Sequence, residues 1–435
     1  MKKKLLSVLL IGGMVTTILT GCAGEAKKEK ENKEVEISFY TTETGKDDMF
    51  MELISDFESK NEGIKVEYIA AGDDQLQKWM SLYASKEGPT VSLMDPINIF
   101  ENQDRMLEFT DENAPFLSNI EESALSTLTF DGKVYGAPMS AAGIGILYNK
   151  EVCDKAVGGE FDPSSIKTVS DLEELFKKIE STGVAATCVT GVDWSIGSHY
   201  LCQIYGAAIG NVEERIEYVD SLKAGTVSLM DNEVFNDYMD TFDLLAKYNY
   251  NSNDPLVGNV NLDAEALATG KCGTWFMGDW AWTYLGPIVE EGQEFGILPI
   301  PRNNDESDVI NQSIPTSYAK AYCVDASQNS EEQQAAGLKF IEYLTSDKDA
   351  HEVLAKVCGQ AFPYKNFEAT IESPLGLSTA SYIAEGLTYD FYGTANLCPS
   401  DIWYECGAYM CEYLAGASDR ATLAKNIETY WRNVK

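Results

Sequence analysis

The chain has 435 residues, more than one ordinary hydrophobic core can organise, so two or three domains are expected. It carries 69 acidic and 33 basic residues, a formal net charge of −36 at pH 7. This charge excludes nucleic acid as a partner, because binding phosphates requires a basic surface, and it disfavours polyanionic ligands.

The first residues predict export from the cell. Three lysines at positions 2–4 precede an uncharged, mostly apolar run over 5–19, which is too short for a comfortable membrane span. The run is followed by Cys22 in the sequence Leu-Thr-Gly-Cys, which resembles the bacterial lipoprotein signal whose cysteine is acylated and becomes the first mature residue. A plain secretory signal is the alternative. We therefore expect a signal peptide over 1–21, a lipid anchor at Cys22 and a disordered tether over 22–34.

The next part of the chain alternates strand and helix patterns. Residues 34–40, 64–70 and 90–94 have the apolar patterns of strands, and residues 50–57 and 76–83 between them carry apolar side chains at helical spacing. This order predicts a parallel sheet covered by helices. After the leader, no other apolar stretch approaches the length of a membrane span.

Two sequence patterns predict helix starts in the second half. Ser170 and Glu173 are spaced as a capping box before an apolar helical face, and Ser330 and Gln333 repeat that spacing. We expect a helix to begin at each.

Nine cysteines remain when Cys22 is set aside, an odd number that cannot all pair within the chain. They lie at positions 153, 188, 202, 272, 323, 358, 398, 406 and 411. No two have the Cys-x-x-Cys spacing of zinc or thioredoxin-type sites. Most lie in apolar runs, which predicts buried free thiols.

Six short motifs follow one another along the chain, and the first is Asp-Gly-Lys-Val-Tyr-Gly-Ala-Pro at 131–138. The others lie at 145–150, 168–179, 267–280, 295–301 and 338–365, the last of which ends in Gly-Gln-Ala-Phe-Pro at 359–363. In this order they resemble the extracellular solute-binding proteins of family 1, the sugar-binding components of ABC importers that include maltose-binding protein. Val169 stands where the family usually has Trp.

The resemblance implies an α/β fold of the periplasmic-binding-protein type, with two lobes joined by crossing hinge segments and the ligand held in the interlobe cleft. The N-terminal lobe would contain residues 35–140 and 316–366. The C-terminal lobe would contain residues 141–315 and 367–435. Cleft closure on a carbohydrate, in the form of an oligosaccharide, would then present the closed shape to the importer.

A sugar presents an apolar C–H face and a ring of hydroxyls, so its site needs aromatic rings and polar acceptors. By resemblance, Trp280, Trp194 and Trp403 are the expected ligand-stacking residues, with Tyr404 packed in the core because adjacent helical residues point apart. Asp279, beside Trp280, is an expected hydroxyl acceptor or a helix N-cap.

Polar groups that follow the first three strands are the expected contribution of the N-terminal lobe, because ligands bind beyond the carboxyl ends of parallel strands. Thr42 and Glu43 follow the first strand, Asp73 the second, and Asp95 and Asn98 the third. Capping of the next helix is the alternative for each Asp. Where the family often has an acidic residue at the lobe crossing, this chain has only Ala and Gly, so the particular sugar is not assigned.

Other aromatic and histidine residues are expected to be structural. Trp275 and Trp282 are expected to pack under a helix start, and Trp79 lies on a helical stripe typical of a core. The solitary His199 and His351 favour surface or capping roles, with no metal site and no cofactor.

Three other functions fit parts of the sequence. A binding protein for a polyamine or a phosphate ester is the nearest alternative, since the acidic charge would suit a polyamine. A glycosidase would need a pair of catalytic carboxylates, but among 69 acidic residues some pair can always be proposed, so such a pair carries no information. No catalytic motif is present, and we therefore expect no enzyme. A purely structural surface lipoprotein is the third.

The expected partners are a mono- or oligosaccharide, the importer membrane subunits and, through the anchor, the membrane. The protein is expected to act as a monomer on the extracellular face.

Overall fold

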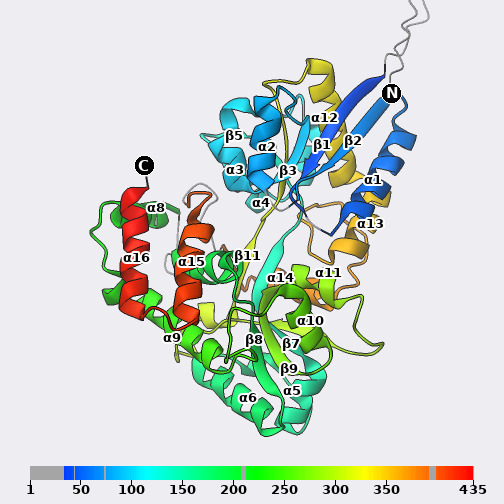
Figure 1. Ribbon diagram of the computed structural model, residues 1–435. Helices are drawn as coiled ribbons and strands as arrows, with labels where there is room; N and C mark the ends of the chain where they lie inside the picture. The colour runs from blue at the N-terminus through cyan, green and yellow to red at the C-terminus, as the bar shows by residue number, and fades with distance from the viewer. Residues whose placement is uncertain (1–33, 44, 73–74, 207–211, 391–397, 435) are drawn as a thin grey trace, which may run out of the picture.

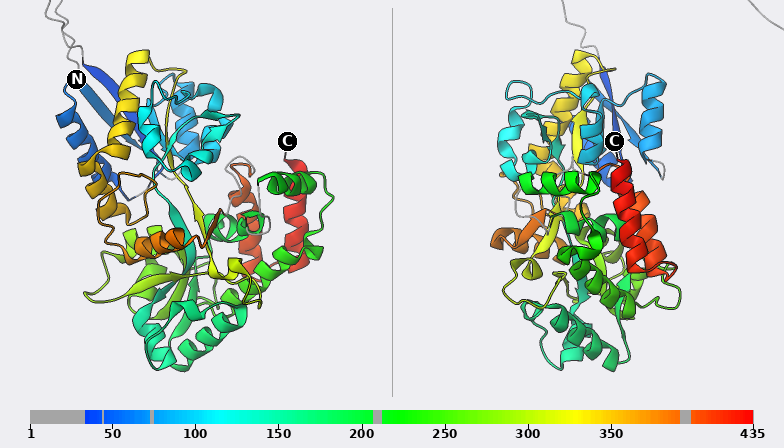
Figure 2. Two further views of the ribbon diagram at one scale, coloured as in Figure 1. Left: turned by 180° about the vertical axis from the view of Figure 1, so that it is seen from behind. Right: turned by 90° about the vertical axis from the view of Figure 1, so that its left-hand side faces the viewer.

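The computed structural model describes residues 34–43, 45–72, 75–206, 212–390 and 398–434. These residues form two α/β lobes, each built on its own sheet, and the chain crosses between them (Figure 1). The two further views in Figure 2 show the lobes stacked one above the other, with the helices nearest the C-terminus on the lower lobe. The two-lobed α/β architecture expected from the sequence is confirmed.

The upper lobe contains a five-stranded sheet with the order β2-β1-β3-β12-β6. Its strands are β1 (Val35–Thr41), β2 (Ile64–Ala70), β3 (Val91–Met94), β6 (Ala137–Pro138) and β12 (Ala321–Val324). β1 pairs in parallel with β2 and β3, as the alternating pattern predicts, while β12 is antiparallel to β3 and β6. A short hairpin of β4 (Thr129–Phe130) and β5 (Lys133–Val134) lies in the chain before β6.

The lower lobe contains a six-stranded sheet with the order β13-β11-β7-β9-β8, in which β10 also pairs with β7. Its strands are β7 (Ala142–Asn149), β8 (Ala185–Val189), β9 (Cys272–Gly278), β10 (Phe295–Leu298), β11 (Ile314–Ser317) and β13 (Thr388–Asp390). β11 belongs to this sheet, so the expected lobe boundary at 315/316 falls inside a strand. The remaining boundaries stay predictions.

Helices cover both faces of each sheet (Figure 1). Those of the upper lobe are α1 (Asp47–Lys60), α2 (Gln75–Ala84), α3 (Pro96–Glu101), α4 (Glu122–Ser126), α12 (Glu331–Ser346) and α13 (Lys348–Cys358). Those of the lower lobe are α5 (Lys150–Val157), α6 (Val169–Ser181), α7 (Gln203–Gly206), α8 (Val212–Lys223), α9 (Glu233–Lys247), α10 (Val260–Ala268), α11 (Trp282–Leu285), α14 (Pro374–Glu385), α15 (Ile402–Leu414) and α16 (Arg420–Asn433).

Alternation along the strands builds a core on each face of each sheet. In the upper lobe, Phe39 packs in the core that contains α1 and α12, while its neighbour Tyr40 joins Trp79 in the core on the other face. In the lower lobe, Phe276 and Trp275 divide in the same way between two cores. Both sheets are thus buried on two sides, as in parallel α/β proteins.

One of the two predicted capping boxes forms as expected. Ser330 accepts from the backbone N–H of Gln333, and the Gln333 side chain accepts in return from the Ser330 N–H. The box predicted at 170 is wrong. Helix α6 begins earlier, because Thr168 accepts from the N–H of Asp171 and the Asp171 carboxylate accepts from the N–H of Lys167.

The nine cysteines after Cys22 are free thiols, eight of them buried and Cys411 partly so. The expectation of buried free thiols is confirmed for those eight. The Sγ atoms of Cys188 and Cys272 lie 3.0 Å apart beneath β8 and β9. Within the described residues, none of the helices combines the length and apolar character that crossing a membrane requires.

Candidate functional site

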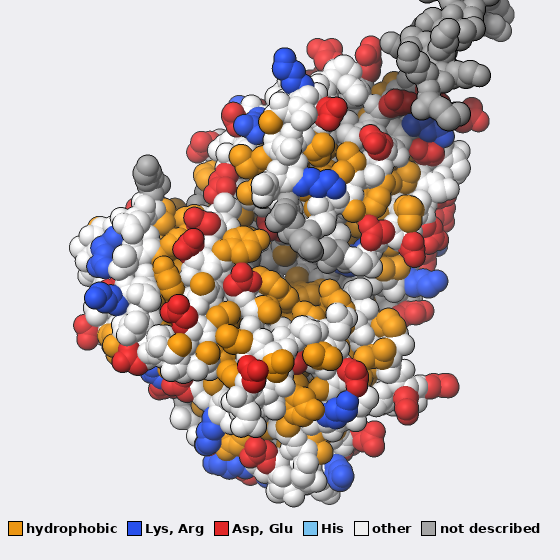
Figure 3. All heavy atoms as spheres, viewed as in Figure 1, with side chains coloured by type: hydrophobic (Ala, Val, Ile, Leu, Met, Phe, Trp, Pro, Cys, Tyr) orange, Lys and Arg blue, Asp and Glu red, His pale blue; other side chains and the backbone are white. Residues whose placement is uncertain are grey.

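A pocket lies between the two lobes, lined by residues of both. Its volume is about 590 Å³, within the usual size of small-molecule sites. The loops that follow β1, β2 and β3 line it from above, and the segments after β8 and β9 together with the start of α15 line it from below. Hydrophobic side chains gather on the lower lobe beside the junction of the lobes (Figure 3).

The three tryptophans expected to stack on a ligand share this pocket. Trp194 begins a π-helical segment over Trp194–Leu201, Trp280 follows β9, and Trp403 lies in the first turn of α15. The imidazole of His199 lies between two of them, with ring centroids 5.4 Å from Trp194 and 4.6 Å from Trp280. The lower lobe therefore presents an aromatic wall, which we define as Trp194, His199, Trp280 and Trp403 together with Tyr404.

The position of Trp280 depends on the glycine two residues before it. A Cβ atom at Gly278 would lie 2.0 Å from the Trp280 ring. The indole therefore rests directly on the Gly278 backbone, and it also packs against the His199 imidazole. No side chain at position 278 is compatible with this placement.

The position of Trp403 depends on a close helix crossing. A Cβ at Gly197 would lie 2.4 Å from the Gly407 Cα, and a Cβ at Gly407 would lie 2.4 Å from the backbone oxygen of Asp193. Because both positions lack a side chain, α15 packs directly on the π-helical segment. The crossing brings Trp403 to the same pocket as Trp194.

The expectation that Tyr404 packs in the core is wrong. Tyr404 is 58% exposed and lines the pocket together with Trp403. Adjacent helical residues do point apart, but these two lie in the first turn of α15, whose end borders the pocket.

The upper lobe lines the pocket with two ion pairs. Lys320 donates from Nζ to Oδ1 of Asp95 at 2.5 Å and to Oγ1 of Thr42 at 2.9 Å. Lys46 pairs through Nζ with Oε2 of Glu43 at 2.5 Å. All five side chains belong to residues that line the pocket, so the polar groups expected at Thr42, Glu43 and Asp95 are brought together.

Both lysines were missed by the sequence reasoning. Lys46 is the residue before α1 and Lys320 is the residue before β12, and neither lies in a recognisable motif. Only the fold brings Lys320 to Asp95, because the two residues are 225 positions apart.

Neighbouring charges offset the effect of burial on the pKa values of Glu43 and Lys320. Burial alone would raise the pKa of Glu43, but the charges of Lys46 and Lys320 hold that pKa below its usual value. Burial alone would lower the pKa of Lys320, but Asp95 and Glu43 raise it. The upper wall therefore carries two positive and two negative groups in contact, with no excess of either sign among these four.

Two other predicted ligand residues do not line the pocket, and a third lies outside the described residues. Asp279 is fully buried at the lobe crossing and does not cap the following helical turn, for which Gly278 is the N-cap. Asn98 lies within α3, 8% exposed and away from the pocket lining. Asp73 lies outside the described residues.

The two histidines differ from expectation. His199 lines the pocket, and burial lowers the pKa of its imidazole to about 3, so the ring is neutral at physiological pH. His351 is 2% exposed and packs against Tyr364 and Phe367, so a surface role is wrong for it.

The tryptophans expected in structural roles are confirmed there. Trp79 is fully buried and donates from Nε1 to Oγ of Ser92 at 3.0 Å. Trp275 is fully buried as well, and Trp282 packs against Phe295.

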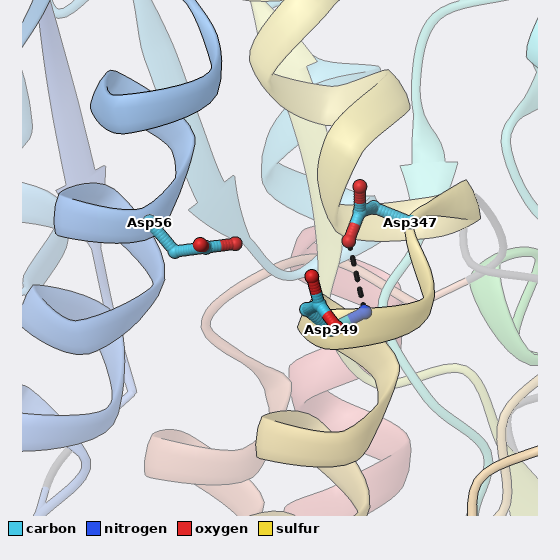
Figure 4. Close-up of side chains that lie close together, drawn as sticks. All are labelled: Asp56, Asp347 and Asp349. Carbon is cyan, nitrogen blue, oxygen red and sulfur yellow. Dashed lines mark hydrogen bonds between the residues drawn. The ribbon is translucent and has the colours of Figure 1, made fainter.

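An acidic cluster lies on the upper lobe, away from the pocket. The carboxylates of Asp56, Asp347 and Asp349 face one another between α1 and the start of α13 (Figure 4). The ammonium of Lys60 contacts all three, at 2.8, 2.9 and 2.6 Å. The cluster is therefore satisfied by a side chain of the protein itself.

Two α/β lobes around a pocket with an aromatic wall and a charge-balanced wall define a binding protein that encloses a small solute. The chain belongs to the bacterial extracellular solute-binding protein family, whose sequence profile matches residues 52–365.

Similar sequences and structures agree with this assignment. The chain is 25% identical over 319 residues to an uncharacterized ABC transporter extracellular-binding protein of Pyrococcus horikoshii, covering 68% of this chain and 70% of that protein. It is 24% identical over 200 residues to the diacetylchitobiose binding protein DasA of Streptomyces coelicolor, covering 42% and 44%.

Solved structures share the fold at low identity. RafE in complex with raffinose superposes with a TM-score of 0.75 at 17% identity, covering 92% of this chain and 99% of that one. A chitin oligosaccharide binding protein superposes with a TM-score of 0.72 at 18% identity, covering 91% and 98%. The two-lobed fold is thereby confirmed over nearly the whole chain.

Proposed function

We propose that this protein binds a neutral carbohydrate, in the form of an oligosaccharide, between its lobes and delivers it to an ABC importer. The observation that carries the proposal is the shared pocket with indoles on one side and fixed polar groups on the other. Each wall suits a different part of such a ligand.

The aromatic wall suits the apolar faces of sugar rings. An indole gives a large flat contact area at little cost in conformational entropy. Trp194, Trp280 and Trp403 all line the pocket, and a single sugar ring has only two faces, so it cannot stack a separate face on each of the three indoles. This arrangement favours a ligand of more than one ring.

The upper wall suits hydroxyl groups. The ammonium of Lys320 and the carboxylate of Asp95 are held in contact, so a pair of neighbouring hydroxyls can accept from one and donate to the other. Glu43 and Lys46 form a second such pair. Hydrogen bonds to charged groups are stronger than neutral ones, and partners that are already fixed lose little entropy on binding.

The charge balance of the pocket disfavours the alternative ligands. The strongly acidic surface would attract a polyamine, but Glu43 and Asp95 are already paired with lysines inside the pocket. A phosphate ester would be expected to use arginine, and no arginine occurs among the described residues that line the pocket. A neutral ligand needs neither an extra cation nor an extra anion.

The names of similar proteins support the same class of ligand. Raffinose, chitin oligosaccharide and diacetylchitobiose are all carbohydrates of more than one ring. In this proposal the cleft closes on a sugar, and the importer recognises the closed form. It would act by binding rather than by catalysis.

A thermal-shift screen tests the ligand class, because a ligand that binds only the folded state raises its stability. The panel contains neutral mono- and oligosaccharides, spermidine and sugar phosphates. We expect stabilisation by a neutral oligosaccharide only. Stabilisation by spermidine or by a sugar phosphate alone would overturn the proposal, and new reducing ends after incubation with oligosaccharides would reveal an enzyme.

We also propose that the mature protein is anchored to the extracellular face of the membrane by acylation of Cys22, with residues 22–34 as the tether, and that it is a monomer. Expression of the full chain in a bacterium that processes lipoproteins is expected to give a membrane-bound product of acylated mass. The Cys22→Ala variant is expected to lose the acyl mass and detach from the membrane. An unmodified, released wild-type chain would instead indicate a plain secretory signal.

A further inference from the structure

A buried polar network lies where the chain crosses between the lobes. Asp279 stands at its centre and is fully buried. Its Oδ2 accepts from the backbone N–H of Gly143 at 2.9 Å and from Oγ1 of Thr379 at 2.8 Å. Its Oδ1 accepts from Nε2 of Gln360 at 3.0 Å.

The bond to Gln360 joins the two lobes. Met277 and Ala281, on either side of Asp279, pack in a core of the lower sheet. Cys358 and Tyr364, on either side of Gln360, pack in a core of the upper sheet. The two partners are therefore anchored to different lobes by their own chain neighbours.

The upper-lobe side of this bond is itself fixed. Oε1 of Gln360 accepts from Oγ of Ser140 at 2.9 Å, in the segment between β6 and β7. One residue further along, the N–H of Ala141 donates to the backbone oxygen of Ala361 at 2.8 Å. These contacts set the orientation of the Gln360 amide, so that its NH₂ faces Asp279.

The other two donors to Asp279 belong to the lower lobe. Gly143 is in β7 and Thr379 is in α14, and a Cβ at Gly143 would lie 2.3 Å from Oγ1 of Thr379. The absence of a side chain at 143 thus lets α14 reach Asp279. The bond from Gln360 is the interlobe contact of this carboxylate, and the bond from Thr379 is a matched contact within one lobe.

We propose that the hydrogen bond between Asp279 and Gln360 is an interlobe hinge contact that limits how far the cleft opens and holds Trp280 in position. Asp279 is a positioning residue. It lies between Gly278, on which the Trp280 ring rests, and Trp280 itself, so a lobe rotation that breaks the bond also frees the turn that carries the indole. The inference rests on the proposed function, in which a cleft between lobes opens and closes.

The polarity of the network allows a test by exchange of partners. Gln360→Met removes the interlobe donor, and Gln360→Glu places a second carboxylate opposite Asp279, so neither single variant keeps the bond from the Gln360 amide. In the double variant with Asp279→Asn and Gln360→Glu, the new amide NH₂ at position 279 donates to the new carboxylate at position 360, which still accepts from Ser140. The amide oxygen at position 279 still accepts from Gly143 and Thr379. The bond is then rebuilt in the reverse direction with the same number of buried carboxylates.

The measurement is made on the unliganded full chain without its signal peptide, by small-angle X-ray scattering and by hydrogen exchange in the turn around Trp280. Both single variants are expected to have a larger radius of gyration than the wild type and exchange about tenfold faster in this turn, the factor that corresponds to one lost hydrogen bond. The double variant is expected to return both values to those of the wild type.

Two controls keep the result interpretable. Thr379→Val removes the matched bond within the lower lobe and is expected to leave the radius of gyration unchanged. If Gln360→Glu does not fold, the comparison rests on Gln360→Met, which is expected to open the lobes, and on the double variant, which is expected to restore them. Folded single variants with wild-type scattering, or a double variant no better than the singles, would overturn the proposal.

Because this test uses no ligand, it is independent of the proposed function. If the protein binds no sugar but the variants behave as expected, the hinge contact stands and only the proposed ligand is wrong. If the protein binds sugar but every variant scatters like the wild type, the proposed function stands and only the hinge contact is wrong.

Discussion

Trp280 has a constrained place in the pocket, since its indole rests on the Gly278 backbone and packs against the His199 imidazole. Its placement costs little further entropy on binding, so its contact area contributes fully to affinity. Trp280→Ala is expected to weaken binding of the oligosaccharide found by the screen by about 2–4 kcal/mol, on the scale of aromatic hot spots. Calorimetry measures the change.

An aromatic residue outside the pocket provides the matched control. Tyr250 is 45% exposed and does not line the pocket, so Tyr250→Ala is expected to leave the affinity unchanged. Equal losses for both variants would show that Trp280 acts through general stability and not through the ligand.

The His199 imidazole makes stability depend on pH. Its pKa is lowered to about 3 in the folded chain, because burial disfavours the charged ring. The unfolded chain therefore binds a proton that the folded chain does not, and stability is lost as pH falls through the ordinary histidine pKa of about 6.5. We expect His199 to remove about 1–2 kcal/mol between about pH 7 and pH 5.

Comparison with His199→Gln isolates this contribution, because the variant keeps a polar side chain of similar length without the titration. The difference in unfolding free energy between wild type and variant should shift against the wild type as pH falls over that interval. A constant difference across the interval would mean that the folded and unfolded chains protonate His199 alike, so that folding does not lower its pKa.

At the scale of residues, the sequence reveals the chemistry of a side chain better than the direction in which that side chain points. Trp194, Trp280 and Trp403 could be singled out because family motifs and a sugar's need for flat apolar contact point to them. That the Asp279 side chain lies away from the pocket could not be predicted, because its position depends on Gln360, 81 positions away in the chain.

Helix α15 and the π-helical segment before α7 illustrate what determines the site at the scale of elements. Their contact has no room for a methyl group, because a Cβ at Gly407 would lie 2.4 Å from a backbone oxygen. Gly407→Ala is expected to force the two elements apart and to destabilise the fold by about 1–3 kcal/mol. Because Trp403 moves with α15 relative to Trp194, affinity for the sugar should fall as well.

Chemical denaturation and calorimetry measure the two effects. Gly159→Ala is the matched control, since a Cβ there meets nothing within 4 Å and its backbone is not left-handed. Wild-type affinity in a folded Gly407→Ala protein would show that the crossing does not position Trp403.

Element patterns in the sequence predicted the regular parts of the fold. The strand over 64–70 agrees with β2, and Ser330 caps α12 as expected. The start of α6 was misplaced because Thr168 caps the helix two residues before Ser170, accepting from the Asp171 N–H while the Asp171 carboxylate accepts from the Lys167 N–H. Local spacing identifies a cap, but competing acceptors decide which one forms.

At the scale of the whole molecule, the two-lobed architecture could be expected only from the ordered series of motifs, because no local pattern reveals which strands join which sheet. β12 returns to the first sheet after β7–β11 have joined the second, and β13 then joins the second sheet again, so the lobes are not consecutive in sequence. Lys320 reaches the pocket through this return, which is why no inspection of its neighbours could identify it.

The charge of the whole molecule and the charge of the pocket predict different responses to salt. A net charge of −36 destabilises the compact state by self-repulsion, and salt screens that repulsion, so the free energy of unfolding should rise from about 0.05 M to about 0.5 M NaCl. The pocket pairs Glu43 with Lys46 and Asp95 with Lys320, so binding of a neutral sugar releases no net charge and its affinity should change less than about twofold over the same range. Calorimetry and chemical denaturation on one preparation measure both. An affinity that falls steeply with salt would indicate that the acidic field attracts the ligand, which would then be a cation and not a neutral carbohydrate.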